Sequence, residues 1–148
     1  MSNPNPNQDL SPGTNANYNE PMVQPGGIPQ NGAMQFAVEL AQLAHDQKCQ
    51  DIVALDVRGV SSVTDYTIIA TGTSDRQMRA VAENIMEHAR RLGQRPFGYC
   101  GFENAAWIIV DFVDVVVHLF AGPYRSYYDL ELLWGDAPRL SWARSDTA

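Results

Sequence analysis

Two apolar runs set close together constrain this chain more than any other feature of its sequence. They occupy residues 107–112 and 115–120, and both are rich in the β-branched and aromatic side chains that favour strands. Only Val113 and Asp114 separate the runs, which leaves room for a tight hairpin turn and nothing larger. The sequence therefore predicts a buried antiparallel hairpin, around which the rest of the chain has to pack.

The remaining elements follow from hydrophobic periodicity and turn signals. Ser74 and Gln77 have the spacing of a capping box, and an apolar stripe of helical period continues to Leu92. An earlier helix is expected at 33–48, strands at 51–57 and 65–71, a strand or loop at 95–102, and a final helix that starts at Gly122-Pro123 and ends at Gly135. This order predicts an α+β domain in which helices flank a mixed β-sheet of about five strands.

Composition divides the chain into three parts. Residues 1–32 are rich in Asn, Pro, Gly and Gln, and are expected to be a disordered tail, because so few apolar side chains cannot offset an ordering entropy of about 1–2 kcal/mol per residue. The tail is either a functional extension or the product of a start upstream of Met34. The folded domain is expected at residues 33–138, followed by a short C-terminal tail at 139–148.

Charge and cysteine content narrow the class of protein. The net charge is −7, and every Lys and Arg lies at or after Lys48, so little direct nucleic-acid binding is expected and a basic protein is a better partner. Cys49 and Cys100 lack metal-binding spacing, which favours apolar filling in a reducing compartment. Membrane-spanning runs and the basic residues of a leader are missing, so the expected location is the cytoplasm.

Two polar groups invite a chemical interpretation. Gly72-Thr73-Ser74 precedes a helix, as anion-binding turns do, but the second glycine and the lysine of a P-loop are missing, which favours a serine-capped helix start. His118 lies between apolar neighbours, with no nucleophile motif to serve, and this favours a structural role.

A set of carboxylates supports an alternative hypothesis, a metal-dependent nucleotidyltransferase-like enzyme. Asp111 and Asp114, with Asp56 or Asp65 on neighbouring strands, are residues of the type that holds Mg²⁺ for phosphoryl transfer. However, strand alternation places Asp111 on the face of Trp107, whereas Asp114 falls in the turn. A structural or interface role is therefore favoured for these carboxylates.

The final helix is predicted to be apolar on two sides. Tyr127, Leu130, Leu133 and Trp134 form one face, Tyr124, Tyr128 and Leu132 form a second, and Arg125 and Asp129 have the i, i+4 spacing of an ion pair. Either the helix simply closes a small core, or one face covers the core and the other meets a partner through residue types that dominate interface hot spots.

Three motifs in order make the chain resemble the ribosomal silencing factor family, also called Iojap-like. They are GTSDRQMRAVAENI, WIIVDFVDVVVHLF and RSYYDLELLW, preceded by DIVALDV and TDYTIIATGTS. The resemblance covers about residues 34–136. It implies a fold similar in outline to nucleotidyltransferases but without their catalytic set, and a protein with no enzymatic activity and no cofactor or metal.

The resemblance also implies a function and a partner. Family members repress translation by binding the large ribosomal subunit through its fourteenth protein, which blocks joining of the small subunit when nutrients are short, and they are often homodimers in isolation. Matching the motifs onto this chain places the partner-binding surface on Trp107, Asp111, His118, Arg125, Tyr128, Asp129, Leu130, Glu131 and Trp134.

Two positions depart from the family pattern. Val113 stands where the family usually has glycine in the hairpin, and valine does not easily supply the positive φ of such a turn, so a wider or differently shaped hairpin is expected. Cys100 replaces a common acidic residue, which removes one charge near the expected interface.

Overall fold

The computed structural model of the chain describes residues 30–144. The elements in order are α1 (Gln30–Asp46), β1 (Gln50–Asp56), β2 (Tyr66–Gly72), α2 (Asp75–Arg91), β3 (Gly98–Cys100), β4 (Trp107–Asp111), β5 (Val115–Ala121), α3 (Gly122–Tyr128) and α4 (Leu130–Trp134). The predicted α+β class is confirmed. Almost all of the predicted N-terminal tail lies outside the described residues.

The five strands form one mixed sheet in the order β1-β2-β5-β4-β3. Strands β4 and β5 pair antiparallel as the predicted hairpin, and β2 and β5 pair parallel at the centre of the sheet. In the hairpin register Trp107 lies opposite Phe120, and Ile109 opposite His118. Paired residues point to the same face of a sheet, so these four side chains share one face.

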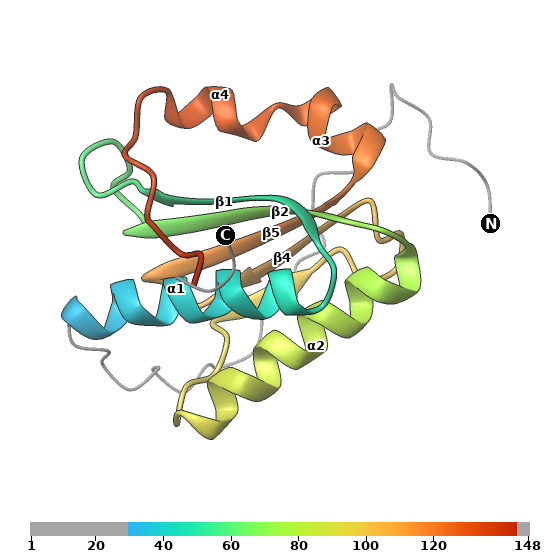
Figure 1. Cartoon of the computed structure of the whole chain (residues 1–148), viewed down its shortest axis with the longest axis horizontal. Coiled ribbons are helices and arrows are strands. Elements are labelled where there is room, and N and C mark those ends of the chain that lie inside the picture. Colours follow the sequence, from blue (N-terminus) through green and yellow to red (C-terminus); the bar gives the residue numbers. More distant parts are fainter. Residues whose placement is uncertain (1–29, 145–148) are drawn as a thin grey trace.

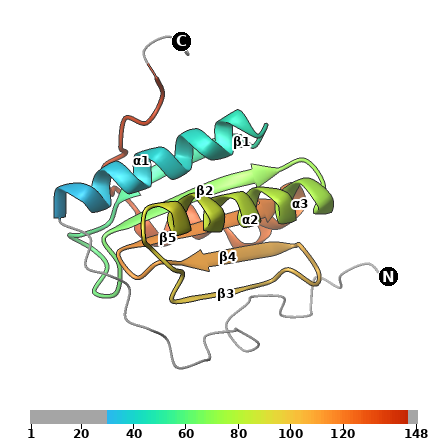
Figure 2. The same ribbon diagram turned by 90° about the horizontal axis from the view of Figure 1, so that it is seen from below.

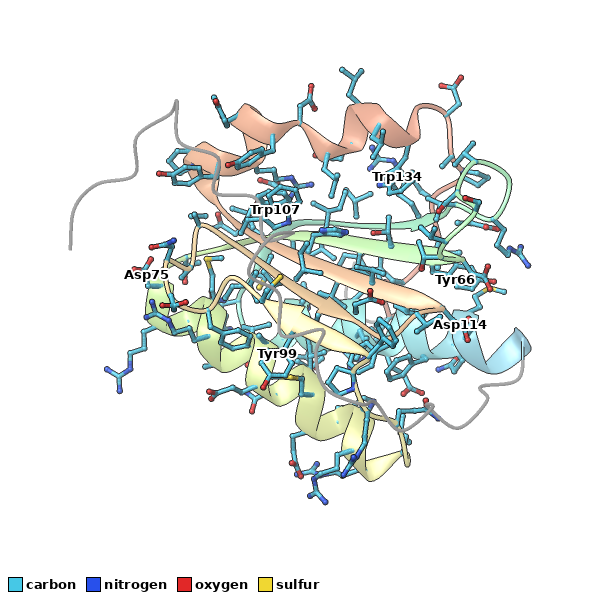
Figure 3. The ribbon with its side chains drawn as sticks, turned by 180° about the vertical axis from the view of Figure 1, so that it is seen from behind. Tyr66, Asp75, Tyr99, Trp107, Asp114 and Trp134 are labelled. Carbon is cyan, nitrogen blue, oxygen red and sulfur yellow. The ribbon has the colours of Figure 1, made fainter. Side chains whose placement is uncertain are left out.

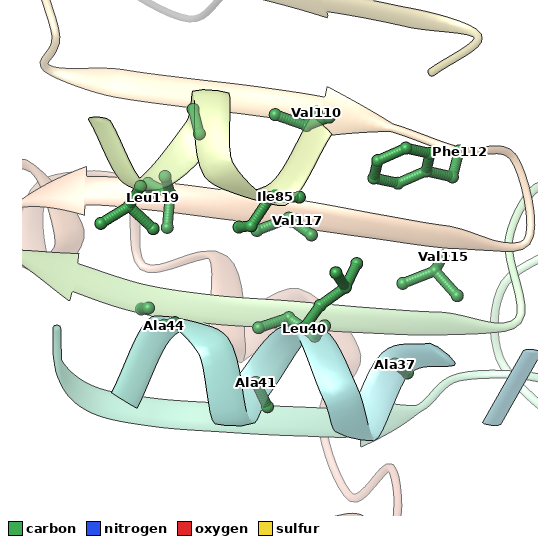
Figure 4. Packing of buried hydrophobic residues seen from close by; sticks show 14 of the residues in the cluster. Ala37, Leu40, Ala41, Ala44, Ile85, Val110, Phe112, Val115, Val117 and Leu119 are labelled. Carbon is green, nitrogen blue, oxygen red and sulfur yellow. The ribbon is translucent and has the colours of Figure 1, made fainter. Parts of the chain in front are cut away.

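Helices α1 and α2 cover the other face and enclose the larger core, as Figures 1 and 2 show. Leu40 and Ile85 pack against Val110, Val117 and Leu119 from the sheet (Figure 4). Ser74 caps α2 by accepting a hydrogen bond from the Gln77 amide, and the Gln77 side chain accepts one from the Thr73 amide. The predicted Ser74 cap is therefore present, while the Gln77 side chain bonds one residue before the N-cap and also donates to the Gln47 carbonyl.

Helices α3 and α4 lie across the face that carries Trp107 and Phe120 (Figure 1). They close a second, smaller apolar cluster whose buried members are Val53, Leu55, Val57, Ile69 and Phe120. The sheet thus separates two cores of unequal size. Within the described residues, no helix is long and apolar enough to cross a membrane.

The single helix predicted from Gly122 onward is wrong, because the chain breaks it at Asp129. This residue has φ 45° and ψ 52°, the left-handed conformation, and separates α3 from α4. Aspartate tolerates this conformation better than most residues. The break changes which side chains share a face, so both predicted apolar faces of the helix are wrong as well.

The hairpin turn also differs from expectation, because Val113 does adopt a positive φ, of 74°. The Phe112 carbonyl accepts a hydrogen bond from the Asp114 amide (2.9 Å), which makes a γ-turn centred on Val113. The Asp111 carboxylate accepts from the Val113 amide at 2.7 Å and so holds the turn from inside. The hairpin is therefore narrow rather than wide.

The chain remains attached to the fold beyond residue 138, where the sequence predicted a tail. The Asp56 amide donates to the Pro138 carbonyl, and the Leu140 amide donates to the Ala54 carbonyl. Further on, Trp142 packs beside α1, and Arg144 forms an ion pair with Asp46 at the end of that helix. We call residues 138–144 the strap, because they cross the β1 edge from one face of the sheet to the other.

Candidate functional site

The inner side of α3 and α4 is built on an aromatic stack. The Trp107 ring stacks on Phe120 with centroids 4.8 Å apart, and the Tyr128 ring lies 4.7 Å from Trp107 on the helix side. Figure 3 shows Trp107 and Trp134 between the sheet and the two helices. Trp107, Tyr128, Leu130 and Trp134 are each half-buried and pack against the smaller core. These four side chains support the surface from within.

His118 lies beneath this stack and is buried. Its Nδ1 accepts a hydrogen bond from the Trp107 indole N–H at 3.1 Å. Burial lowers the pKa of His118 to about 3, so the ring is neutral near pH 7 and serves as an acceptor for tryptophan. This geometry agrees with the structural role favoured by the sequence.

Asp111 is half-buried on the same face of the sheet, beside the hairpin turn. Burial raises the pKa of Asp111, and the hydrogen bond from the Val113 amide opposes that rise. Burial and the neighbouring Asp65 raise the pKa of Asp114. In the described part of the chain, no three His, Cys, Asp or Glu side chains gather as metal ligands would. The described residues therefore provide no geometric support for the alternative hypothesis of a nucleotidyltransferase-like enzyme.

Arg125 does not form the predicted pair with Asp129. It makes a bidentate ion pair with Glu131, in which Nε donates to Oε1 at 3.0 Å and Nη2 donates to Oε2 at 3.1 Å. Its Nη1 donates to the Thr71 hydroxyl at 2.8 Å and to the Asp51 carbonyl. The hydrogen bond from Arg125 lowers the pKa of Glu131, which burial opposes. The Arg125 side chain is only 12% exposed and that of Glu131 is 34% exposed, so the guanidinium is mostly buried and the carboxylate is partly accessible.

A polar hollow of about 540 Å³ opens beside this pair, between α3, α4 and the start of β1. It has carboxylates and guanidinium groups on its walls. The lining residues are Asp51, Ile52, Val53, Thr71, Gly122, Arg125, Ser126, Asp129, Glu131 and Arg139.

The outer side of α3 and α4 exposes three large apolar side chains. Tyr127 is 55% exposed, Leu132 75% and Leu133 67%. Asp129 is exposed beside them. We call Tyr127, Asp129, Leu132 and Leu133 the outer patch. Apolar groups gathered on a surface with a charged neighbour are typical of a protein-binding surface.

The predicted site residues omit Tyr127, Leu132 and Leu133, although Leu132 belongs to the second apolar face of the predicted helix. For Tyr127 and Leu133 the reason is the assumption of one continuous helix. A continuous helix would place Tyr127 and Leu133 on the core face together with Leu130. The left-handed residue between α3 and α4 turns Leu133 outward instead. The sequence did indicate an exposed apolar surface in one respect, because the predicted helix has more apolar residues than a single face packed on the core can bury.

The nine sequence-predicted site residues therefore fall into three groups. Asp129 is exposed in the outer patch. Arg125 and Glu131 form the internal ion pair. The remaining residues are buried or half-buried in the stack and its surroundings, and they are Trp107, Asp111, His118, Tyr128, Leu130 and Trp134. Whether any of the nine contacts a partner remains a prediction.

Comparison with solved structures supports the fold. A crystal structure of a Chromobacterium violaceum protein is 36% identical in sequence and superposes with a TM-score of 0.65, covering 76% of this chain and 93% of that one. A Bacillus halodurans structure gives a TM-score of 0.63 at 34% identity and covers 76% of this chain and 99% of that one.

Comparison with known sequences identifies the family. A ribosomal silencing factor from Bacillus subtilis is 47% identical over 98 residues, which are 66% of this chain and 83% of that protein. A mouse protein named mitochondrial assembly of ribosomal large subunit protein 1 is 31% identical over 115 residues, or 76% of this chain and 50% of the mouse protein. Residues 30–148 match the family described as ribosomal silencing factor during starvation. This chain belongs to the ribosomal silencing factor, or Iojap, family, whose members are non-enzymatic factors that silence translation in starvation.

Proposed function

We propose that this protein represses translation by binding the large ribosomal subunit through its fourteenth protein and by physically blocking the small subunit. Membership of a silencing family supports repression, and the name of the mouse relative ties a homologue to the large subunit. The observation that carries the proposal is the outer patch, in which three large apolar side chains of the short α3–α4 segment are each more than half exposed. The same proposal places the protein in the cytoplasm with the ribosomes it binds.

The chemistry of the outer patch suits a basic ribosomal protein. Tyr127, Leu132 and Leu133 offer apolar area that can be desolvated at the centre of an interface. Asp129 and the overall charge of −7 complement a basic partner and would steer its approach. We assign direct contact to the outer patch and a supporting role to the stack of Trp107 and Tyr128 beneath it.

Truncation of the outer patch should weaken subunit binding strongly without unfolding the protein. We expect Leu132→Ala/Leu133→Ala to weaken co-sedimentation with purified large ribosomal subunits by at least about tenfold, because hot-spot truncations cost about 2 kcal/mol or more. Both side chains are mostly exposed, so the thermal midpoint should change little. Light scattering of mixed subunits should show that wild-type protein prevents their joining and that the double variant does not.

Leu92→Ala is the matched control, because Leu92 is 51% exposed at the end of α2, on the opposite face of the sheet from α3 and α4 (Figure 1). It should sediment with the subunits as wild type does. Full binding by the double variant would show that the outer patch is not the docking surface. Normal subunit joining in the presence of bound wild-type protein would contradict the steric block.

A further inference from the structure

We propose that Arg125 and Glu131 form an internal clamp that positions α4 for docking and that neither side chain contacts the partner. The inference rests on the proposed function and deepens it, because it separates residues that touch the ribosome from residues that hold the touching surface in place. It gives a new role to two of the residues that family resemblance places in the interface.

The first support is the use of the Arg125 donors. Four hydrogen bonds join this side chain to three separate segments: two to the Glu131 carboxylate, one to Thr71 of β2 and one to the Asp51 carbonyl of β1. A guanidinium has five N–H groups, so four of its donors are committed within the fold. With 12% of its side chain exposed, Arg125 has little left to offer a partner.

The second support is the position of the Asp51 carbonyl. The pairing of β1 with β2 shifts register between Gln50 and Val53, and Asp51 has φ 50°. A bulge of this kind bends a strand and re-aims its groups. Here the Asp51 carbonyl, at the bulge, accepts a hydrogen bond from Arg125. The bulge in β1 thus supplies one of the acceptors that hold the Arg125 side chain in place.

The third support is the break at Asp129, without which the clamp cannot form. Residues 125 and 131 are six positions apart, which on a continuous helix places them about 120° apart around the axis and about 9 Å apart along it. The left-handed conformation of Asp129 lets α4 fold back so that Glu131 reaches Arg125. The ion pair therefore exists only in the broken geometry and stabilises that geometry in return.

The clamp fixes where the outer patch points. Helix α4 has only five residues, far fewer than a helix needs to be stable alone. Glu131 at its start is tied to Arg125, and Trp134 at its end packs against the smaller core. Leu132 and Leu133 lie between these two anchors. Loss of one anchor would therefore let α4 change its orientation, although every side chain that contacts the partner would still be present.

Amide hydrogen exchange on the free protein tests the clamp without the ribosome. We expect Glu131→Gln and Arg125→Gln to raise exchange at the amides of Leu132 and Gly135, which donate to the carbonyls of Asp129 and Leu132 at the two ends of α4, and to leave α2 unchanged. Glu131→Gln is the safer variant, because Glu131 is 34% exposed and the replacement keeps its shape. Unchanged exchange within α4 would overturn the clamp.

Binding to purified large ribosomal subunits tests the positioning role. Each single variant should lose about tenfold in affinity, within the range known for residues that modulate a site without touching its ligand. The double variant Arg125→Gln/Glu131→Gln should lose no more than either single variant, because both remove the same clamp. Ile85→Val in the larger core, on the opposite face of the sheet, controls for lost stability and should bind as wild type.

Salt dependence separates positioning from contact. Arg125 and Glu131 together carry no net charge, so the double variant Arg125→Gln/Glu131→Gln should keep the wild-type dependence of affinity on salt. Asp129→Asn, which changes an exposed carboxylate in the outer patch, should make that dependence shallower. Additive losses with a shallower slope for the double variant would place the pair in contact with the partner and overturn the proposal, as would unchanged affinity in both single variants.

Failure of the proposed function and failure of the clamp would give different experimental results. If wild-type protein does not sediment with large subunits, the proposed function is wrong and the positioning role falls with it. The amide-exchange result would still decide whether the clamp holds α4.

Discussion

The strain at Val113 is the clearest residue-scale feature of the hairpin. A β-branched side chain at φ 74° is a strong exception to normal backbone preference. We expect Val113→Gly to raise the free energy of unfolding by about 1 kcal/mol, because glycine adopts this conformation without a Cβ clash. Urea denaturation measures the change. Val63→Gly, at an exposed valine without positive φ, should instead destabilise the protein, and a gain there would refute the explanation.

We expect the free energy of unfolding to fall as the pH decreases from 6.5 to about 3, because His118 is buried in its neutral form. Burial lowers the folded pKa to about 3 from an ordinary value of 6.5, so below pH 6.5 the unfolded chain binds a proton that the folded one does not. The contribution of the neutral ring to the free energy of unfolding is fully present above pH 6.5. It decreases as the pH falls toward about 3, by at most about 1.4 kcal/mol per pH unit.

His118→Asn isolates this contribution. An asparagine oxygen can replace Nδ1 as acceptor for the Trp107 indole, but it does not titrate. We expect the unfolding free energy of the variant to depend less steeply on pH between 6 and 4 than that of wild type. Denaturation curves at several pH values would show parallel profiles if His118 played no part.

At the scale of elements, the break between α3 and α4 makes a prediction that a continuous helix would reverse. Asp129→Ala should lower the unfolding free energy by about 1 kcal/mol, because alanine is disfavoured in the left-handed conformation. Asp129→Gly should be neutral or stabilising for the opposite reason. In a continuous helix alanine would be the better residue of the two. Thermal unfolding of the pair decides which geometry is present in solution.

The elements that sequence predicts well are those whose signals are local. The hairpin of β4 and β5, the Ser74 cap and the apolar stripe of α2 all depend on residues a few positions apart. The faces of α3 and α4 depend on distant groups instead. Arg125 bonds to Asp51 and Thr71, which lie 74 and 54 positions away. Helical periodicity carries no information about such distant contacts. The sequence therefore indicates that Arg125 and Glu131 matter but does not predict where their side chains point.

At the scale of the whole molecule, the strap belongs to the stable fold. Truncation after Ala137, near the boundary that sequence predicted, removes the hydrogen bonds to β1 and the packing of Trp142 on α1. We expect a loss of about 3 kcal/mol in unfolding free energy, measured by urea denaturation. Trp142→Ala alone should lose less, about 2 kcal/mol. Full stability in the truncated chain would support the domain boundary at residue 138 that the sequence predicts.

The route of the strap has a practical consequence for anyone who wishes to tether or label the protein. The chain leaves α4, crosses the β1 edge and reaches the end of α1, where Arg144 pairs with Asp46 (Figure 1). A dye, an affinity handle or a link to a sensor chip joined after Arg144 would start on the opposite side of the sheet from Tyr127 and Leu133. Immobilised from that end, the molecule should present its outer patch to solution with no obstruction from the support.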